Sequence, residues 1–196
     1  MAKYGMLNRP EVFDVKINTI GIEDMENRKT DTYMHILDNA GEVIVGSSMV
    51  IAGANTEEQG IPLISWTHDF WQPAQVERTS QEGVSVSSSI HGDLTVIKKL
   101  DATTPHLLKA CWSGQPLQEV KLNCYRSTTN NYMNIRVTNA LITDYTIFDI
   151  PGYPDSMEKV KFNYLAVEYA YNPTGLLDAL DGNIPVAYDR TTKIVQ

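Results

Sequence analysis

The stretch DLTVIKKLDATTPHLLKACWSG, residues 93–114, decides the fold because it joins a strand directly to a short helix. The strand is predicted over Val84 to Leu100, and it begins where Val84 and Val86 alternate with serines. His91-Gly92-Asp93 interrupts this strand, which predicts a bulge or bend at that point.

The helix follows at once. Asp101 to Pro105 supplies a threonine-type N-cap and a proline at the first helical position, the arrangement that helix N-termini favour. Leu107, Leu108 and Cys111 fall on one face, and Gly114 is placed to end the helix. We therefore expect a helix of about two to three turns.

Strands dominate the chain on the C-terminal side of this helix. Val120 to Cys124 alternates apolar and polar residues, Thr128 to Asn131 is a polar turn-forming cluster, and Tyr132 to Ile147 is rich in β-forming residues. This order predicts a hairpin. Val160 to Tyr164 alternates again and continues into Leu165 to Tyr171, which is apolar on both faces. A strand that becomes apolar on both faces predicts contact with another sheet or another subunit.

Several further elements are shorter. The predicted strands are Val12 to Ile20, Tyr33 to Leu37, Glu42 to Val45, Ile61 to Trp71 and Ile184 to Tyr188, with a turn at Asp38 to Gly41 and a helical turn at Leu176 to Leu180. Many short strands with one helix predict a mainly β chain, folded as a closed or nearly closed β-barrel with one short α-helix packed on its side. The 196 residues fit a single domain.

Composition excludes several classes of partner. The formal net charge is -8, which argues against nucleic acid because phosphate binding needs a positive field. No run approaches the roughly 18 apolar residues of a membrane helix, so we expect no membrane insertion. The N-terminus lacks the apolar core of a secretory signal. We therefore expect synthesis as a cytoplasmic chain and, if the protein is exported, export without a cleaved signal peptide.

No catalytic constellation is evident. His68-Asp69 and His91-Gly92-Asp93 each put a histidine near a carboxylate, but no GxSxG or HExxH motif accompanies them. We favour structural roles for these histidines and expect no catalytic residue, no cofactor and no metal site. A hydrolase using either pair is the alternative. For Cys111 and Cys124 we favour two buried free thiols over a disulfide.

Aromatic residues indicate where subunits meet. Trp66 and Phe70 share strand parity while Trp71 does not, so both faces of that segment carry aromatic bulk. One face can line the barrel interior, and the other then needs a partner. The expected interface residues are Trp66, Phe70, Trp71, Leu165, Val167, Tyr169 and Tyr171.

The order of these motifs resembles the haemolysin-coregulated protein (Hcp) family of type VI secretion systems. Residues 93–114 resemble the family's signature of a strand, a Thr-Pro helix start and a closing glycine. The family's later strands are matched by Leu117 to Arg126, Tyr132 to Tyr145 and Glu158 to Pro173, and its early tryptophan strand by Ile64 to Trp66. The resemblance covers residues 61–173.

The resemblance implies a tail tube protein: a homo-hexamer whose rings stack into a hollow tube. In that family a contractile sheath surrounds the tube, a spike protein tips it, a baseplate carries it, and effectors travel in its lumen. A tube protein of a contractile phage tail or extracellular injection particle is a second possibility. A small-ligand-binding β-barrel is a third.

The chain departs from the family pattern at its ends. We divide the single domain into an N-terminal extension (1–32), a barrel core (33–173) and a C-terminal tail (174–196). The family's stacking loop lies between early strands, and both 38–60 and 72–83 fit that position. The sequence leaves these two alternatives open.

Overall fold

The fold comes from a computed structural model. It describes residues 32–46, 60–72, 74–75, 85–86, 88–127, 130–173 and 182–196. No helix in this described part is long and apolar enough to cross a membrane. The predicted strand at Val12 to Ile20 and the helical turn at Leu176 to Leu180 lie outside the described residues.

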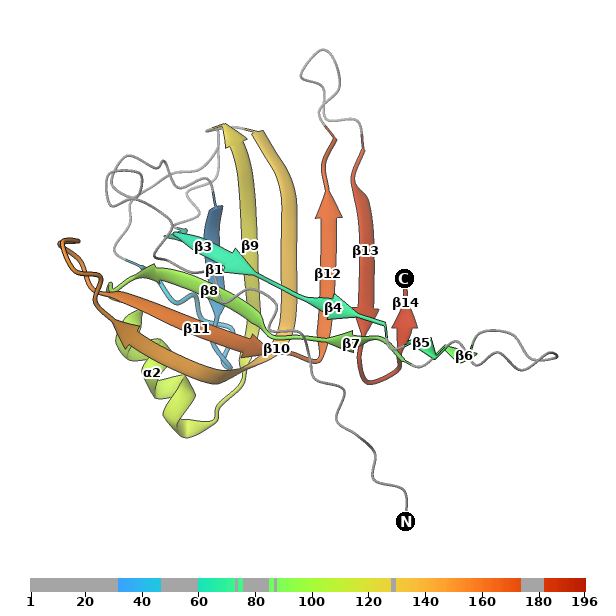
Figure 1. The fold of residues 1–196 in the computed structure, drawn as a ribbon, viewed down its shortest axis with the longest axis horizontal. Helices are drawn as coiled ribbons and strands as arrows, with labels where there is room; N and C mark the ends of the chain where they lie inside the picture. The colour runs from blue at the N-terminus through green and yellow to red at the C-terminus, as the bar shows by residue number, and fades with distance from the viewer. Residues whose placement is uncertain are drawn as a thin grey trace.

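Antiparallel strands build the upright half of the molecule (Figure 1). Their order across the sheet is β2 (Ile61–Pro62), β1 (Thr32–Leu37), β9 (Leu117–Ser127), β10 (Asn130–Phe148), β12 (Ala166–Tyr171), β13 (Ile184–Asp189) and β14 (Ile194–Val195). The predicted hairpin is therefore confirmed as β9 and β10, and the predicted strand at the C-terminal end as β13.

The second half of the ladder starts from the same strand, β10. There β10 pairs with β11 (Met157–Asn163), β11 with β8 (Leu94–Lys99), and β8 with β3 (Ser65–Thr67). Because β2 and β3 are consecutive in the chain, one short segment bonds first to β1 and then to β8: Leu63 N–H donates to Thr32 O and Ile64 N–H to Ile97 O. The ladder thus bends round on itself as a barrel.

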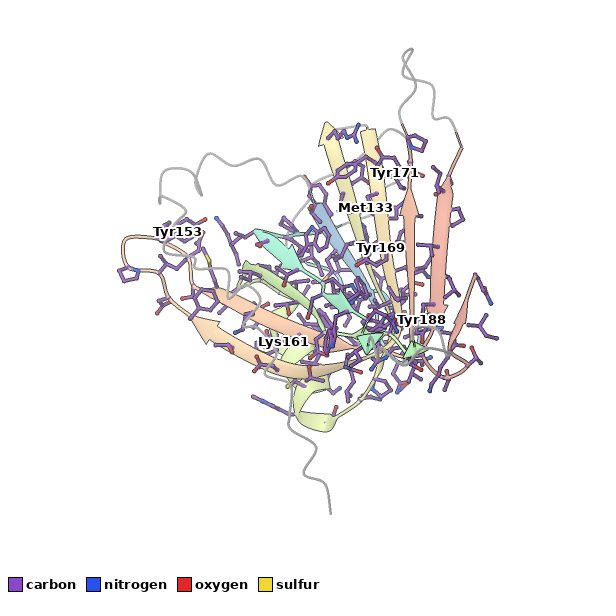
Figure 2. All side chains as sticks on the ribbon, turned by 45° about the vertical axis from the view of Figure 1, so that its right-hand side comes forward. Met133, Tyr153, Lys161, Tyr169, Tyr171 and Tyr188 are labelled. Carbon is purple, nitrogen blue, oxygen red and sulfur yellow. The ribbon has the colours of Figure 1, made fainter. Side chains whose placement is uncertain are left out.

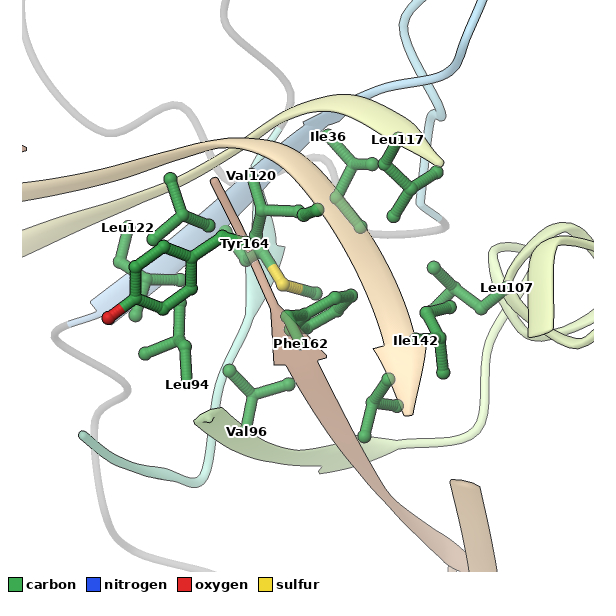
Figure 3. Packing of buried hydrophobic residues seen from close by; sticks show 14 of the residues in the cluster. Ile36, Leu94, Val96, Leu107, Leu117, Val120, Leu122, Ile142, Phe162 and Tyr164 are labelled. Carbon is green, nitrogen blue, oxygen red and sulfur yellow. The ribbon is translucent and has the colours of Figure 1, made fainter. Parts of the chain in front are cut away.

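Apolar side chains from both halves fill the barrel interior (Figure 3). Leu94, Val120, Leu122, Val160 and Phe162 are all fully buried. These residues hold the alternate positions that the sequence pattern assigned to the inner face of each strand. The core is therefore the expected consequence of period-two alternation.

The long strand apolar on both faces is interrupted. Tyr164 and Leu165 separate β11 from β12. Both strands keep the same register with β10 next to this kink, with Asn163 opposite Leu141 and Ala166 opposite Thr138, whereas the β10–β11 register shifts further along, between Ile142 and Asp144. Asn139, on β10 next to Thr138, has a positive φ of 49°. Asparagine tolerates this left-handed conformation better than most residues. At the kink the chain changes direction, so β12 runs away from β11 (Figure 1).

The helix α2 (Thr104–Ser113) confirms the predicted boundaries, including the proline in its first turn and Gly114 in the left-handed conformation at its end. Its N-cap differs in detail, since the Thr103 hydroxyl donates to Asp101 Oδ1 instead of capping the helix. Its buried face is Thr104, Leu107 and Ala110, so Leu108 and Cys111 lie at the edge of the predicted face.

Other expectations need correction. Ile61 to Trp71 is divided into β2, β3 and β4 (Phe70–Trp71), because the segment changes partner from β1 to β8 and then leaves the barrel. Glu42 to Val45 makes only an isolated bridge at Val43, after the expected Asp38 to Gly41 turn. Both cysteines are free, as favoured; Cys124 is buried, whereas Cys111 is only partly buried.

A buried ion pair connects the strand to the helix. Lys98 and Glu158 face each other on β8 and β11, are both fully buried, and lie 2.6 Å apart between Nζ and Oε1. Lys98 Nζ also contacts Asp101 Oδ1 at 2.8 Å, and the Tyr145 hydroxyl donates to Glu158. Burial opposes ionisation of Asp101, but hydrogen bonds from Lys98 and Thr103 lower its pKa. One ammonium thus satisfies two carboxylates.

Replacing Lys98 by methionine should therefore destabilise the protein strongly. The change leaves Glu158 without its counter-ion, which costs about 3–5 kcal/mol for a buried pair. Lys99→Met is the matched control, because Lys99 and Asp155 form an ion pair that is half exposed and worth less than about 1 kcal/mol. Urea denaturation at one protein concentration compares the two, and equal midpoints would contradict the prediction.

Candidate functional site: an open sheet face and the arm beside it

The core-facing side chains of β12 and β13 form cross-strand pairs. The pairs are Val167 with Tyr188, Tyr169 with Val186, and Tyr171 with Ile184. Burial falls along the strands, from 5% exposed at Val167 to 40% at Tyr171 and 62% at Ile184. Figure 2 shows Tyr188, Tyr169 and Tyr171 one above another along this face. The barrel therefore covers only one end of it.

We call the exposed end of this apolar surface the open face. It consists of Tyr171, Ile184, Val186 and Val195, the last being the β14 neighbour of Tyr188. Val186 is 49% and Val195 67% exposed. Adjacent exposed apolar side chains of this kind mark a surface that another protein covers.

Two short ladders lie beside the open face, and we call them the arm together with the described residues that flank them. The arm comprises residues 68–72, 74–75, 85–86 and 88–92, and its ladders are β4 with β7 (Ile90–His91) and β5 (Ala74–Gln75) with β6 (Ser85–Val86). Neither ladder belongs to the main sheet. In Figure 1 the arm leaves β3, passes β12 and β13, and projects outward on the side of β14.

His68 anchors the arm to the sheet. Its Nδ1 lies 2.6 Å from the Tyr169 hydroxyl and its Nε2 2.6 Å from the Tyr164 hydroxyl, so both ring nitrogens are hydrogen-bonded. The Phe70 ring packs on both His68 and Tyr169, at 4.3 and 5.8 Å between centroids. Aromatic and hydrogen-bond contacts thus hold the base of the arm on β12.

His91 makes the second attachment. Its ring stacks on Tyr188 of β13 at 4.4 Å, and its Nδ1 lies 3.3 Å from the Tyr164 hydroxyl. Its Nε2 is 3.1 Å from the Ser89 hydroxyl. The two histidines therefore share Tyr164 as a partner.

These contacts fit neutral imidazoles, in which one ring nitrogen donates and the other accepts. Burial, and then the nearby His91, lower the pKa of His68 from 6.5 to about 4. Burial and Arg190 also lower the pKa of His91. Burial raises the pKa of Tyr164 and of Tyr169, so both hydroxyls keep their protons. At neutral pH the cluster is an uncharged hydrogen-bond network.

Arg190 stabilises the kink beneath this cluster. Its guanidinium donates to Tyr164 O at 2.6 Å and to Asn163 Oδ1 at 2.9 Å, and its backbone N–H donates to Leu165 O. Asn163 in turn donates to Asp93 Oδ1 at the base of the arm. The turn after β13, the kink and the arm are thereby connected.

The structure brings some of the expected interface residues together and separates others. Phe70 and Trp71, 45% and 40% exposed, lie on the arm, and Tyr171 lies on the open face. Val167 is buried in the protomer's own core, and Trp66 packs against that core. The remaining two are Leu165, exposed at the kink, and Tyr169, partly buried beneath the arm.

The expected set did not include Ile184, Val186 and Val195 of the open face. Alternation of Ile184, Val186 and Tyr188 is visible in the sequence and indicated a strand. It does not show that the barrel stops short of that strand, which depends on the kink at Tyr164.

The structure shows what the two candidate histidines contact. The ring nitrogens of His68 bond to tyrosine hydroxyls, and those of His91 to Ser89 and Tyr164. The Asp93 carboxylate accepts bonds from Thr143 and Asn163. The structural interpretation of both histidines therefore has direct support from their contacts.

Comparison with known proteins matches this barrel to one family. The family description "Type VI secretion system effector, Hcp" matches residues 33–171. The chain belongs to the Hcp family. The resemblance inferred from residues 93–114 is thereby confirmed, and with it the assignment as a tail tube protein of a type VI secretion system.

Individual Hcp relatives agree with this assignment. The "Major exported protein" of Pseudomonas aeruginosa is 25% identical over 81% of this chain and 98% of its own length. A solved type six secretion system protein covers 86% of this chain and all of its own, with a TM-score of 0.73 at 18% identity. Hcp1 from Salmonella typhimurium covers 85% and 99%, with a TM-score of 0.62 at 20% identity. The fold is thus the Hcp barrel with a helix at its side.

Removing the Tyr164 hydroxyl should loosen the arm. Tyr164→Phe leaves partly buried nitrogens of His68 and His91 without their partner, which costs about 1–3 kcal/mol. The control is Tyr171→Phe, whose exposed hydroxyl accepts a hydrogen bond from Arg126, and which should change stability by less than about 0.5 kcal/mol. Denaturant unfolding measures both, and a neutral Tyr164→Phe would contradict the role given to this hydroxyl.

Proposed function

We propose that copies of this chain form hexameric rings that stack into the hollow tube of a type VI secretion system. The observation that supports this most directly is the open face, where apolar side chains continue the barrel core onto β13 and β14 without cover from the part of the protomer that the structure describes. A neighbouring subunit that covers this face would complete the core. The role is structural, and the proposal includes no catalytic step.

A second exposed apolar surface makes a closed ring possible. Trp112 of α2 is 80% exposed, and Val43 and Val45 are 56% and 47% exposed. Val43 and Val45 flank Ile44, which lines a pocket together with His106 and Lys109 of α2. In Figure 1 α2 and β13 lie on opposite sides of the molecule. Two different surfaces on opposite sides fit a head-to-tail contact, and such contacts close into rings when the rotation per subunit allows it.

We assign the expected interface residues to different parts of this proposed assembly. We place Tyr171 in the ring contact with the rest of the open face, and Phe70 and Trp71 in the contact that the arm makes. Leu165, exposed at the kink, borders the ring contact. Trp66, Val167 and Tyr169 support these surfaces from within, because they pack against the core of their own subunit.

Of the two stacking loops left open by the sequence, we propose 72–83. This segment contains β5, whose ladder with β6 projects from the barrel (Figure 1). A ladder that projects from the barrel can reach a neighbouring ring. The segment 38–60 begins with a tight turn in which Asp38 accepts bonds from Ala40 and Glu42.

The remaining partners follow from the family assignment. We propose that the tube assembles in the cytoplasm, is enclosed by a contractile sheath, and meets a spike protein and a baseplate at its end. Export would carry effectors in the lumen and needs no cleaved signal peptide. Support for export comes from the relative named "Major exported protein". The ligand-binding alternative has less support, since apolar side chains fill the barrel interior (Figure 3).

Ring formation can be tested on the open face. Val186→Asp places a carboxylate where a neighbour is proposed to pack, so rings should give way to monomers, because burying an unpaired charge is costly. Thr146→Asp adds the same charge at an exposed site on β10, on neither of the two apolar surfaces, and should leave rings intact. Light scattering and negative-stain microscopy distinguish the outcomes, and intact rings in Val186→Asp would refute this face as the contact.

Stacking can be tested separately on the arm. Trp71→Asp changes an arm residue outside the open face, so rings should persist while stacked tubes are lost or shortened. Electron microscopy at high protein concentration measures tube length against single rings. Tubes of normal length in Trp71→Asp would show that stacking does not depend on this part of the arm.

A further inference from the structure

The arm is held on the sheet by side chains instead of a shared ladder. β4 pairs with β7 and β5 with β6, and these ladders are separate from the sheet that contains β12 and β13. The contacts across the boundary come from His68, Phe70 and His91 on the arm and meet tyrosines on β12, on β13 and at the kink. An attachment of this kind can open without breaking the barrel.

His68 and His91, two of the anchoring side chains, can each take up a proton in acid. Neutral His68 accepts one hydrogen bond and donates one, and this matches the two tyrosine hydroxyls at 2.6 Å. A protonated ring can only donate. Tyr164 would then have to accept from His68 and His91 together while the Arg190 guanidinium lies 5.3 Å from its ring centre. Two imidazolium charges and the guanidinium would then surround one buried tyrosine.

Nearby carboxylates do not offset this charge. The titratable and charged groups that face His68 from the surrounding elements are His91, Asp69, Asp93, Arg190, Tyr164 and Tyr169. Asp69 and Asp93 favour the protonated ring, but burial and His91 outweigh them. The Asp93 carboxylate is also occupied by Thr143 and Asn163. The docked arm therefore excludes protons from His68.

We propose that the arm is an acid-released strap: it docks on β12 and β13 while His68 and His91 are neutral, and it detaches when they are protonated. Release exposes both rings to water, where protonation meets no burial cost and no second histidine. The barrel, whose ladders and core do not include these rings, stays folded.

Linkage gives the expected size of the effect. In the docked state the pKa of His68 is about 4, and in the released state it returns towards 6.5. Docking is thus fully favoured above pH 6.5 and weakens as pH falls towards 4. At pH 5 this difference shifts the equilibrium towards release by about 30-fold for His68 alone. His91, whose pKa is also lowered, adds to the shift in the same direction.

The three tryptophans provide a built-in test. Full-length protein carrying 5-fluorotryptophan is titrated from pH 7.5 to 4 by fluorine NMR. Trp71 lies on the arm, Trp66 on β3 of the barrel and Trp112 on α2. The Trp71 resonance should shift with a midpoint between pH 4 and pH 6.5, while those of Trp66 and Trp112 stay constant over that range. A constant Trp71 resonance, or a simultaneous change of all three, would overturn the proposal.

Glutamine variants test the cause. His68→Gln with His91→Gln keeps polar side chains that do not titrate, so the Trp71 transition should disappear. His106→Gln, on an exposed face of α2, should leave the transition unchanged. If the double variant does not fold, His91→Gln alone should shift the pH midpoint of the Trp71 resonance. It removes the second of the two histidine charges beside the Tyr164 hydroxyl. A transition of unchanged midpoint in every folded histidine variant would refute the proposal.

A consequence for the tube rests on the proposed function. If the arm carries the stacking contact, tubes should separate into rings over the same pH range in which Trp71 shifts. Electron microscopy of the same samples records this independently. Release of the arm without loss of tubes would leave the strap intact and count against the arm as the stacking contact, so the two proposals can fail separately.

Discussion

A lysine ammonium without solvent exposure lies between β8, β11 and the turn into α2. Transferring such a charge from water is costly, so the structure around it has to supply acceptors with good geometry. Glu158 comes from the opposing strand, Asp101 from the start of the helix turn, and Lys99 O from the chain itself. Strand register and helix position are thereby coupled, because moving either one would leave a buried charge without its partner.

The end of β11 also determines where the barrel ends. β11 follows β10 up to Tyr164, whose ring is buried in the core, and β12 continues along β10 beyond the kink. On the β11 side of the kink, alternate side chains are buried in the protomer's own core. On the other side, the inner face of β12 and β13 becomes progressively exposed. A small change of strand direction thus converts a barrel wall into an exposed apolar face, the one that we propose as the subunit contact.

Tyr164 has three roles in this arrangement. Its ring packs in the core, its carbonyl oxygen accepts from Arg190, and its hydroxyl meets both histidines of the arm. The open face and the arm are therefore not independent features of the surface. Tyr164, the residue at which the long strand kinks, positions both of them.

Local elements were predictable from neighbouring residues alone. Pro105 and Gly114 determine the ends of α2, and alternation in Val120 to Cys124 determines which side of β9 is buried, because each signal acts within one turn or one strand. Other features depend on residues far apart. Lys98 looks like any strand lysine until Glu158 is placed opposite it, and His68 meets Tyr169 across 101 positions of sequence. The sequence by itself thus determined α2, the β9–β10 hairpin, β13 and the family. Only the tertiary structure decided which apolar face stays open and what holds the arm, because strand register and the kink set which distant side chains meet.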